Sequence, residues 1–277
     1  MKPETRNGLV PNPEEQALQE TVARLRASLT ALLLQKDELL LIQCKRVESL
    51  YLRRFGALEL KLYEAWCDCL RAKKKAKLIR VCRNRRQAVD VEQIEARLEE
   101  ELGVYRQQLE QRSSRVFGAL RSGEGSGLTS RGVKELKNLY RQAVKALHPD
   151  LHPGEEEARS RILQQAMRAY RSGDLPGLRT ICESLDPDRE QEISSLTELR
   201  AELSRLRGQI RSLDGQLEAI KSEYPMNMQV YLEDEARGKQ HEAELLDNLR
   251  EIRERTVRYE AEISAMLAPE DSEVDFR

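Results

Sequence analysis

Aromatic residues, glycine, proline and histidine are scarce in this chain. Only 4% of its 277 residues are aromatic, and it contains 14 glycines, 9 prolines and 3 histidines. Leucine, glutamate, arginine, alanine and glutamine dominate instead, and charged residues make up 34%. This composition is typical of long helices and coiled coils. Such a chain buries narrow seams between helices, so an ordinary globule with one thick core is not favoured.

Long apolar runs and paired cysteines are also absent. No segment approaches 18 uncharged apolar residues, and the first residues lack the apolar stretch of a signal peptide. The five cysteines, which include Cys67 and Cys69, form no CxxC pair. We therefore expect a soluble, cytoplasmic protein with reduced thiols and no membrane contact.

Sequence signatures of catalysis are missing as well. There is no glycine-rich phosphate loop, no HExxH motif and no Ser/His/Asp arrangement in a strand–turn context. Three histidines in a helical chain are a poor basis for acid–base chemistry. We expect no enzymatic activity and no cofactor.

A long helix is expected near the start of the chain. Pro13 suits a first helical turn, where its missing amide is tolerated. Apolar residues from Leu18 to Leu32 then step by alternating intervals of four and three, as in a coiled-coil seam. Asp90 and Gln93 form a capping-box pattern that starts a second helix. We expect this second helix to fold back antiparallel on the first.

The C-terminal part carries the most regular seam. Eight apolar residues from Leu196 to Ile220 step by intervals of three and four over nearly four heptads. Tyr224-Pro225 ends this helix, because the residue before a proline is disfavoured in the helical conformation. A last helix repeats the pattern from Leu245 to Met266. We expect the two helices to form a second antiparallel hairpin.

These patterns predict an all-α fold in which elongated antiparallel coiled-coil hairpins flank a small helical module. Heptads can be satisfied within one chain or between chains, so oligomerisation is left open. The predicted organisation is a disordered tail at 1–13, an N-terminal coiled-coil hairpin at 14–120, a linker at 121–130, the module at 131–186, a C-terminal coiled-coil hairpin at 190–268 and a tail at 269–277.

The module at 131–186 carries the most specific pattern. A basic helix runs directly into His148-Pro149-Asp150, and Pro149 ends the helix at His148. A second amphipathic helix follows, and the two can bury their apolar faces against each other. Basic residues spaced by three or four positions line up on the opposite face of the first helix, which predicts a docking surface for an acidic partner. They are Lys134, Lys137, Arg141 and Lys145.

Residues 131–185 resemble the J-domain of the DnaJ family. The resemblance rests on Leu139-Tyr140-Arg141 with Ala143, on His148-Pro149-Asp150, and on Ala169-Tyr170 after the second helix. Coiled coils on both sides are similar to a group of bacterial J-domain proteins. The resemblance implies a co-chaperone whose basic helix and His-Pro-Asp loop bind the ATPase domain of a DnaK-type chaperone and trigger ATP hydrolysis. The coiled coils would then contact client proteins or an assembly.

By position, the resemblance assigns Lys137, Tyr140 and Arg141 to the partner-facing surface. This sequence also departs from the family. The family's first short helix is not clear and would be replaced by Val116–Leu120 or by the coiled coil, and Gln142 stands where a second basic residue is usual. No Gly/Phe-rich region and no zinc-binding cysteine repeat follow, so client capture in the DnaJ manner is not implied.

Two other interpretations remain open. One is a structural coiled-coil scaffold with a degenerate J-like module. The other is an RNA- or ribosome-associated protein that uses the basic stretch 71–86, although the net charge of the chain is only −1. The stretch offers no aromatic platform for bases, so such binding would be non-specific and salt-dependent. Its candidate contacts are Lys73, Lys74, Lys75, Lys77, Arg80 and Arg83.

A metal site is not expected. His148, Asp150 and His152 alternate along the loop, but no other histidine or cysteine is close in sequence to complete a four-ligand set. Cys67 and Cys69 would point to different sides of a helix and could not share an ion.

Overall fold

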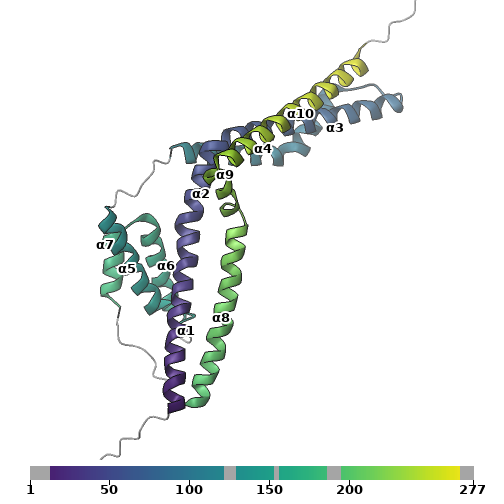
Figure 1. The fold of residues 1–277 in the computed structure, drawn as a ribbon. Coiled ribbons are helices and arrows are strands. Elements are labelled where there is room, and N and C mark those ends of the chain that lie inside the picture. Colours follow the sequence, from purple (N-terminus) through teal and green to yellow (C-terminus); the bar gives the residue numbers. More distant parts are fainter. Residues whose placement is uncertain (1–12, 122–128, 153–155, 186–194, 269–277) are drawn as a thin grey trace, which may run out of the picture. The chain divides into compact units, whose positions relative to one another are not determined.

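The computed structural model describes residues 13–121, 129–152, 156–185 and 195–268. Within these ranges all regular structure is helical, which confirms the all-α prediction (Figure 1). None of the described helices combines the length and apolar character needed to cross a membrane. The tails predicted at 1–13 and 269–277, and most of the linker predicted at 121–130, lie outside the described residues.

The chain divides into two compact units, each built from segments far apart in sequence. The first combines Met1–Arg46 with Glu124–Asn227, and the second combines Val47–Gly123 with Met228–Arg277. Each unit therefore takes one part from the beginning of the chain and another from later in the sequence.

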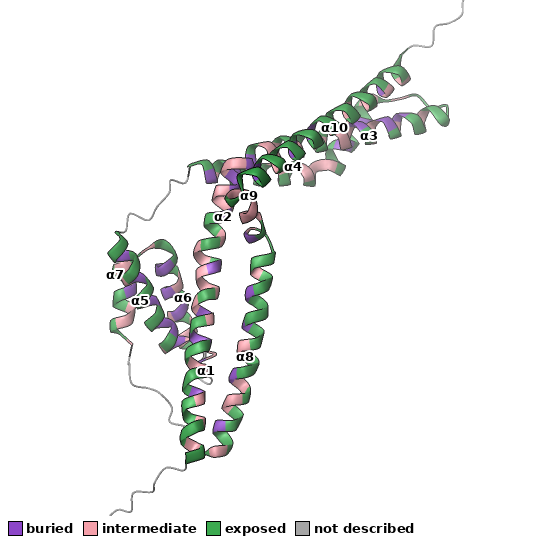
Figure 2. Cartoon of the chain, in the orientation of Figure 1, coloured by how far each residue is buried: buried purple, intermediate pink, exposed green. Residues whose placement is uncertain are grey.

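The first unit is organised around a parallel pair of helices, α1 (Pro13–Glu38) and α8 (Leu196–Ser222). Glu14 near the start of α1 pairs with Arg200 at 2.5 Å, and Lys36 near its end donates to Gln216 at 2.7 Å, so both helices run in the same direction. The predicted seams of the two helices face each other. Buried residues follow both helices (Figure 2). They include the seam residues Val22 and Leu29 and the neighbouring Leu33 on α1, and the seam residues Leu199, Leu206, Leu213 and Leu217 on α8.

Three short helices complete the first unit: α5 (Ser130–Leu147), α6 (Glu156–Ser172) and α7 (Leu175–Glu183). Side chains cap two of them, since Thr129 accepts a hydrogen bond from the Gly132 amide and Asp174 accepts one from Gly177. Their apolar faces meet around Tyr140 and Tyr170, whose rings stack with centroids 4.2 Å apart. We call α5, α6 and α7 the three-helix module.

The module is not a separate unit, contrary to the domain boundaries expected from sequence. Its buried residues belong to one apolar cluster with the seam of α1 and α8, and α5 packs directly on α1. Val116–Leu120, one candidate for the family's short first helix, forms part of α4 and belongs to the second unit. The coiled-coil helix α1 packs on α5 instead.

The second unit is built on α3 (Ala57–Asn84), which follows α2 (Cys44–Tyr51) and a π-helical turn, η2 (Leu52–Gly56). A similar turn, η1 (Leu39–Gln43), precedes α2.

Gly56 is buried, and an added Cβ would lie 3.0 Å from Val116 of α4 (Val91–Arg121). The glycine therefore permits a close approach of α4. The long helix expected near the start of the chain extends from Pro13 to Asn84 and includes these two π-helical turns.

Helix α4 runs antiparallel to α3, as predicted. Asp90 accepts a hydrogen bond from the Gln93 amide at its start. Tyr63 donates to Gln108 at 2.7 Å, and Arg71 pairs with Glu95 at 2.5 Å. Helix α4 packs on η2 and α3, and its Arg115 pairs with Glu48 of α2, whereas the first helix of the chain packs on α8. The N-terminal hairpin predicted at 14–120 is therefore wrong for α1, which packs on α8, while α4 packs on the helix that continues from α2 to α3.

The C-terminal hairpin predicted at 190–268 is wrong. Helix α8 belongs to the first unit, whereas α10 (Glu235–Leu267) belongs to the second and packs on α3. Arg54 pairs with Glu235, and Arg80 pairs with Glu262, so α10 runs parallel to α3. Periodicity specifies which side of a helix is apolar but not which helix covers it.

Within the second unit, an aromatic cluster packs the start of α10 against α2 and η2. The ring of His241 stacks on Tyr231 of the short helix α9 (Gln229–Glu233) at 4.2 Å and meets the edge of Phe55. Its Nε2 lies 2.9 Å from the hydroxyl of Tyr51, which also donates to Glu59. His241 therefore lies among aromatic rings, although the helix that carries it is rich in charged residues.

Candidate docking site around His148

The loop after α5 is shaped by its own hydrogen bonds. The helix ends at Leu147, and His148 takes an extended backbone before Pro149, as predicted. The amides of Leu151 and His152 both donate to the His148 carbonyl, at 3.0 and 3.1 Å. The Asp150 amide donates to Nδ1 of His148 at 3.1 Å. The tripeptide therefore forms a compact turn in which the imidazole accepts a backbone hydrogen bond.

One flank of α5 faces α1, which carries two adjacent acidic residues. The buried Tyr140 donates its hydroxyl to Asp37 Oδ2 at 2.6 Å. Lys137, one turn earlier on α5, pairs with Glu38 at 2.7 Å. Of the residues expected to face an external partner, Tyr140 and Lys137 thus contact a helix of the same unit. We call Asp37 and Glu38 the acidic pair.

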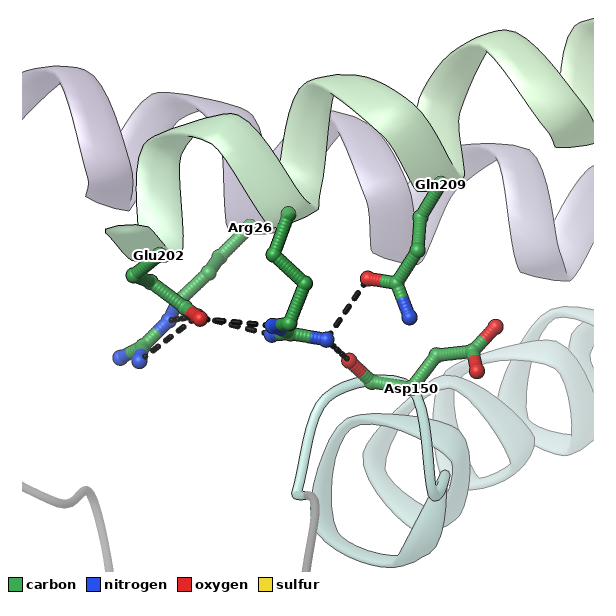
Figure 3. Close-up of polar contacts among 5 residues, drawn as sticks. Arg26, Asp150, Glu202 and Gln209 are labelled. Carbon is green, nitrogen blue, oxygen red and sulfur yellow. Dashed lines mark hydrogen bonds and ion pairs between the residues drawn. The ribbon is translucent and has the colours of Figure 1, made fainter. Parts of the chain in front are cut away.

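The loop is also bound from α8. Arg205 Nη1 donates to the Asp150 carbonyl and to Gln209 Oε1, both at 2.8 Å. The same guanidinium forms two hydrogen bonds with Glu202, at 2.7 and 2.8 Å. Arg26 of α1 reaches Glu202 Oε1 at 3.1 Å, so α1, α8 and the loop share one polar network (Figure 3).

Burial and charge set the protonation of this site. Burial raises the pKa of Asp37, although the hydrogen bond from Tyr140 opposes this shift. Burial lowers the pKa of His148 more than Asp150 and Asp37 raise it, so the neutral imidazole is favoured. Neutrality agrees with Nδ1 accepting the Asp150 amide. Hydrogen bonds from Arg205 lower the pKa of Glu202, whose side chain is only 11% exposed.

The tripeptide is partly covered rather than presented freely to solvent. The side chain of His148 is 17% exposed and that of Asp150 is 40% exposed. Pro149 is half-buried, and Leu151 after it joins the apolar cluster. An external partner could reach Asp150 in this arrangement but would meet little of the imidazole.

The rest of the basic stripe remains at the surface. Lys134, Arg141 and Lys145 are exposed. They lie on the side of α5 away from its buried face, because residues three and four apart share one side of a helix. Lys137 is exposed as well, with 47% of its side chain accessible, and its ammonium group also pairs with Glu38 of α1.

The loop histidines are engaged in ways that do not suit a shared metal ion. His152 Nε2 donates to the Lys145 carbonyl at 2.7 Å, while His148 Nδ1 accepts the Asp150 amide. Among the described residues, no three side chains of the His, Cys, Asp and Glu types are grouped to hold an ion.

Acidic partners neutralise much of the basic stretch 71–86 in the second unit. Arg71 and Lys75 pair with Glu95, and Lys74 pairs with Glu101. Both glutamates lie on α4. Lys74 and Arg97 lower the pKa of Glu101 to about 2. On the other side of α3, α10 contributes Glu262 to Arg80 and the Met266 carbonyl to Arg83, while Lys73 and Lys77 are exposed.

Sequence reasoning missed the residues that hold the docking face. Asp37, Glu38, Glu202 and Arg205 lie outside residues 131–186 and look like ordinary polar positions of coiled-coil helices. The one signal that could have found Asp37 and Glu38 is their position as adjacent acids beside an apolar seam. Nothing in the periodicity indicates that α5 would pack there.

The fold and site define an all-α protein in which a three-helix module with a His-Pro-Asp turn is docked on a parallel helix pair. Compared with known proteins, the chain matches no family model, no curated protein and no solved structure.

Proposed function

We propose that this chain is a J-domain co-chaperone that docks on a DnaK-type chaperone and stimulates its ATP hydrolysis. The observation that supports the proposal is the turn at His148–Asp150, which follows directly from a basic helix. Stacking of Tyr140 on Tyr170 joins that helix to α6, so the two residues that carried the sequence resemblance on either side of the loop are in contact. The loop therefore keeps a defined shape that a partner can recognise.

The proposed docking combines charge with shape. Exposed ion pairs contribute about 0.2–1 kcal/mol each, so Lys134, Arg141 and Lys145 together supply at most about 3 kcal/mol. Micromolar binding requires about 8 kcal/mol. The loop and the covered flank of α5 must supply the rest of the binding free energy. Binding is therefore expected to be transient and to weaken as salt is added.

The direct test is steady-state ATP hydrolysis by purified DnaK in the presence of this chain. Wild type is expected to accelerate hydrolysis, and His148→Gln is expected to abolish the acceleration. His152→Gln is the matched control, because it makes the same substitution in the same loop four residues later. Equal rates with no chain, wild type and His148→Gln would exclude the function.

A second candidate is a structural scaffold in which the module only braces the helix pair. It is favoured by one observation: Tyr140 is 2% exposed and bonded to Asp37 of the same unit. The scaffold predicts no effect on ATP hydrolysis even when the module is released from α1, and light scattering would report whether it forms oligomers.

A further inference from the structure

The flank of α5 that carries Tyr140 and Lys137 is occupied by acidic side chains of α1. We propose that the acidic pair, Asp37 and Glu38, is an internal competitor that holds the docking face closed until an acidic partner displaces it. This inference rests on the proposed function. It adds that the described arrangement is a closed state, and that docking requires α5 to separate from α1.

The first support is the match in chemistry. A basic helix face selects a partner with carboxylates, and α1 supplies two carboxylates to that face: Asp37 accepts from Tyr140 at 2.6 Å and Glu38 pairs with Lys137 at 2.7 Å. A partner using the same contacts cannot bind while these are occupied. Because Tyr140 is buried, displacement is required rather than optional.

The second support comes from the loop, which is bound independently by α8. Arg205 donates to the Asp150 carbonyl and is itself held by Glu202 and Gln209. The Arg205 contact restrains the His148–Asp150 turn, while the acidic pair restrains the helix that precedes it. The same surface is thus restrained from two helices. A chance packing contact between the module and its neighbour would not need both restraints.

The exposed basic residues complete the arrangement. Lys134, Arg141 and Lys145 lie at the surface in the closed state. An acidic partner can therefore be attracted by charge before the flank is open. Competition between the partner's carboxylates and the acidic pair would then release Lys137 and Tyr140. A closed docking face lowers apparent affinity by the fraction of molecules that are open.

The test opens the face without touching α5 or the loop. The variant Asp37→Ala/Glu38→Ala removes both carboxylates, and alanine preserves the helix because it has the highest helix propensity. The matched control is Glu15→Ala/Glu20→Ala, which removes two acids from the same helix near its start. Two readouts are taken on the full chain: amide hydrogen exchange of α5, and stimulation of DnaK ATP hydrolysis as a function of chain concentration.

We expect the opened variant to exchange the α5 amides faster and to reach half-maximal stimulation at a concentration about tenfold lower, if about a tenth of wild-type molecules are open. The control should match wild type in both readouts. Adding His148→Gln to the opened variant should abolish stimulation.

Each other outcome counts against a stated claim. Unchanged exchange of α5 would show that the acidic pair does not hold the face, and would overturn the inference. Faster exchange with the same stimulation curve as wild type would also overturn it, while leaving the proposed function intact. Faster exchange with no stimulation by any form would exclude the proposed function, and the inference with it.

Discussion

The hydroxyl of Tyr140 lies 2.6 Å from Oδ2 of Asp37, a residue 103 positions earlier in the chain. Burial raises the pKa of both groups. A tyrosine that stays protonated keeps its proton available to donate, and a buried carboxylate needs such a donor to remain charged. The contact therefore links the basic helix α5 to α1 through a hydrogen bond that depends on both partners.

Tyr140→Phe is expected to weaken the hold of α5 on α1. The substitution keeps a ring that can stack on Tyr170 but leaves Asp37 without its donor, and a hydrogen bond to a charged group contributes about 1.5–3 kcal/mol. Amide exchange of α5 should accelerate accordingly. Tyr63→Phe, which removes the hydroxyl that donates to Gln108 in the second unit, should leave α5 exchange unchanged. Equal protection in both variants would contradict the role assigned to Asp37.

Arg205→Met is expected to loosen the loop by about 1–2 kcal/mol, because the Asp150 carbonyl loses its donor and Glu202 retains only Arg26. The figure is discounted because the Arg205 side chain is 29% exposed. The measurement is amide exchange of Leu151 and His152.

Glu202→Gln tests whether Arg205 restrains the loop together with Glu202. The double variant Arg205→Met/Glu202→Gln should cost less than the sum of the single variants, because the two residues share one network. Strict additivity would show that the network does not restrain the loop.

The first unit should lose stability as the pH falls through the range in which His148 titrates. Burial lowers the folded-state pKa of this imidazole below its ordinary value of 6.5. Its contribution is therefore fully present above pH 6.5 and is lost as the pH falls through the folded-state pKa. Exchange-derived stability of α5 between pH 7.5 and 5.5 should show this slope, which His148→Gln should remove and His152→Gln should retain.

The neighbouring groups act on the same slope with different signs. Asp37, Asp150, Lys36 and His152 all influence the imidazole. Glu202, with a pKa below 4.5, contributes loss of stability only at more acidic pH. The raised pKa of Asp37 works in the opposite direction, since acidification relieves its buried charge. A rise in stability on acidification would show that Asp37 dominates the site.

Gly238→Ala is expected to destabilise the second unit by about 1–3 kcal/mol. An added Cβ would lie 2.5 Å from Arg54 Nη2 and 2.7 Å from the Tyr231 carbonyl, and the backbone oxygen cannot move easily. Trp66, the single tryptophan, lies in this unit and reports its unfolding by fluorescence. Gly103→Ala on α4 meets nothing within 4 Å and should instead stabilise by about 0.5–1 kcal/mol.

Local patterns predicted local structure well. The all-α class, the end of α5 before Pro149, the cap at Asp90 and the end of α8 before Tyr224-Pro225 all follow from residues within a few positions of each other. Each depends on backbone geometry or a short-range hydrogen bond, so it could be predicted without knowing which distant segments pack together.

Which helices pair was decided by the tertiary structure alone. The seam of α8 is as regular in the sequence as any in the chain, yet it packs on α1 rather than on the helix that follows it, and α10 packs on α3. Leucines repeated at intervals of three and four fit any similar seam, parallel or antiparallel. The same limit explains why Asp37 and Arg205 could not be assigned to the site: their importance comes from where α5 is docked. The sequence by itself determined the helices, their apolar faces and the end of the basic helix at His148, while only the packing of distant helices decided that the turn is covered.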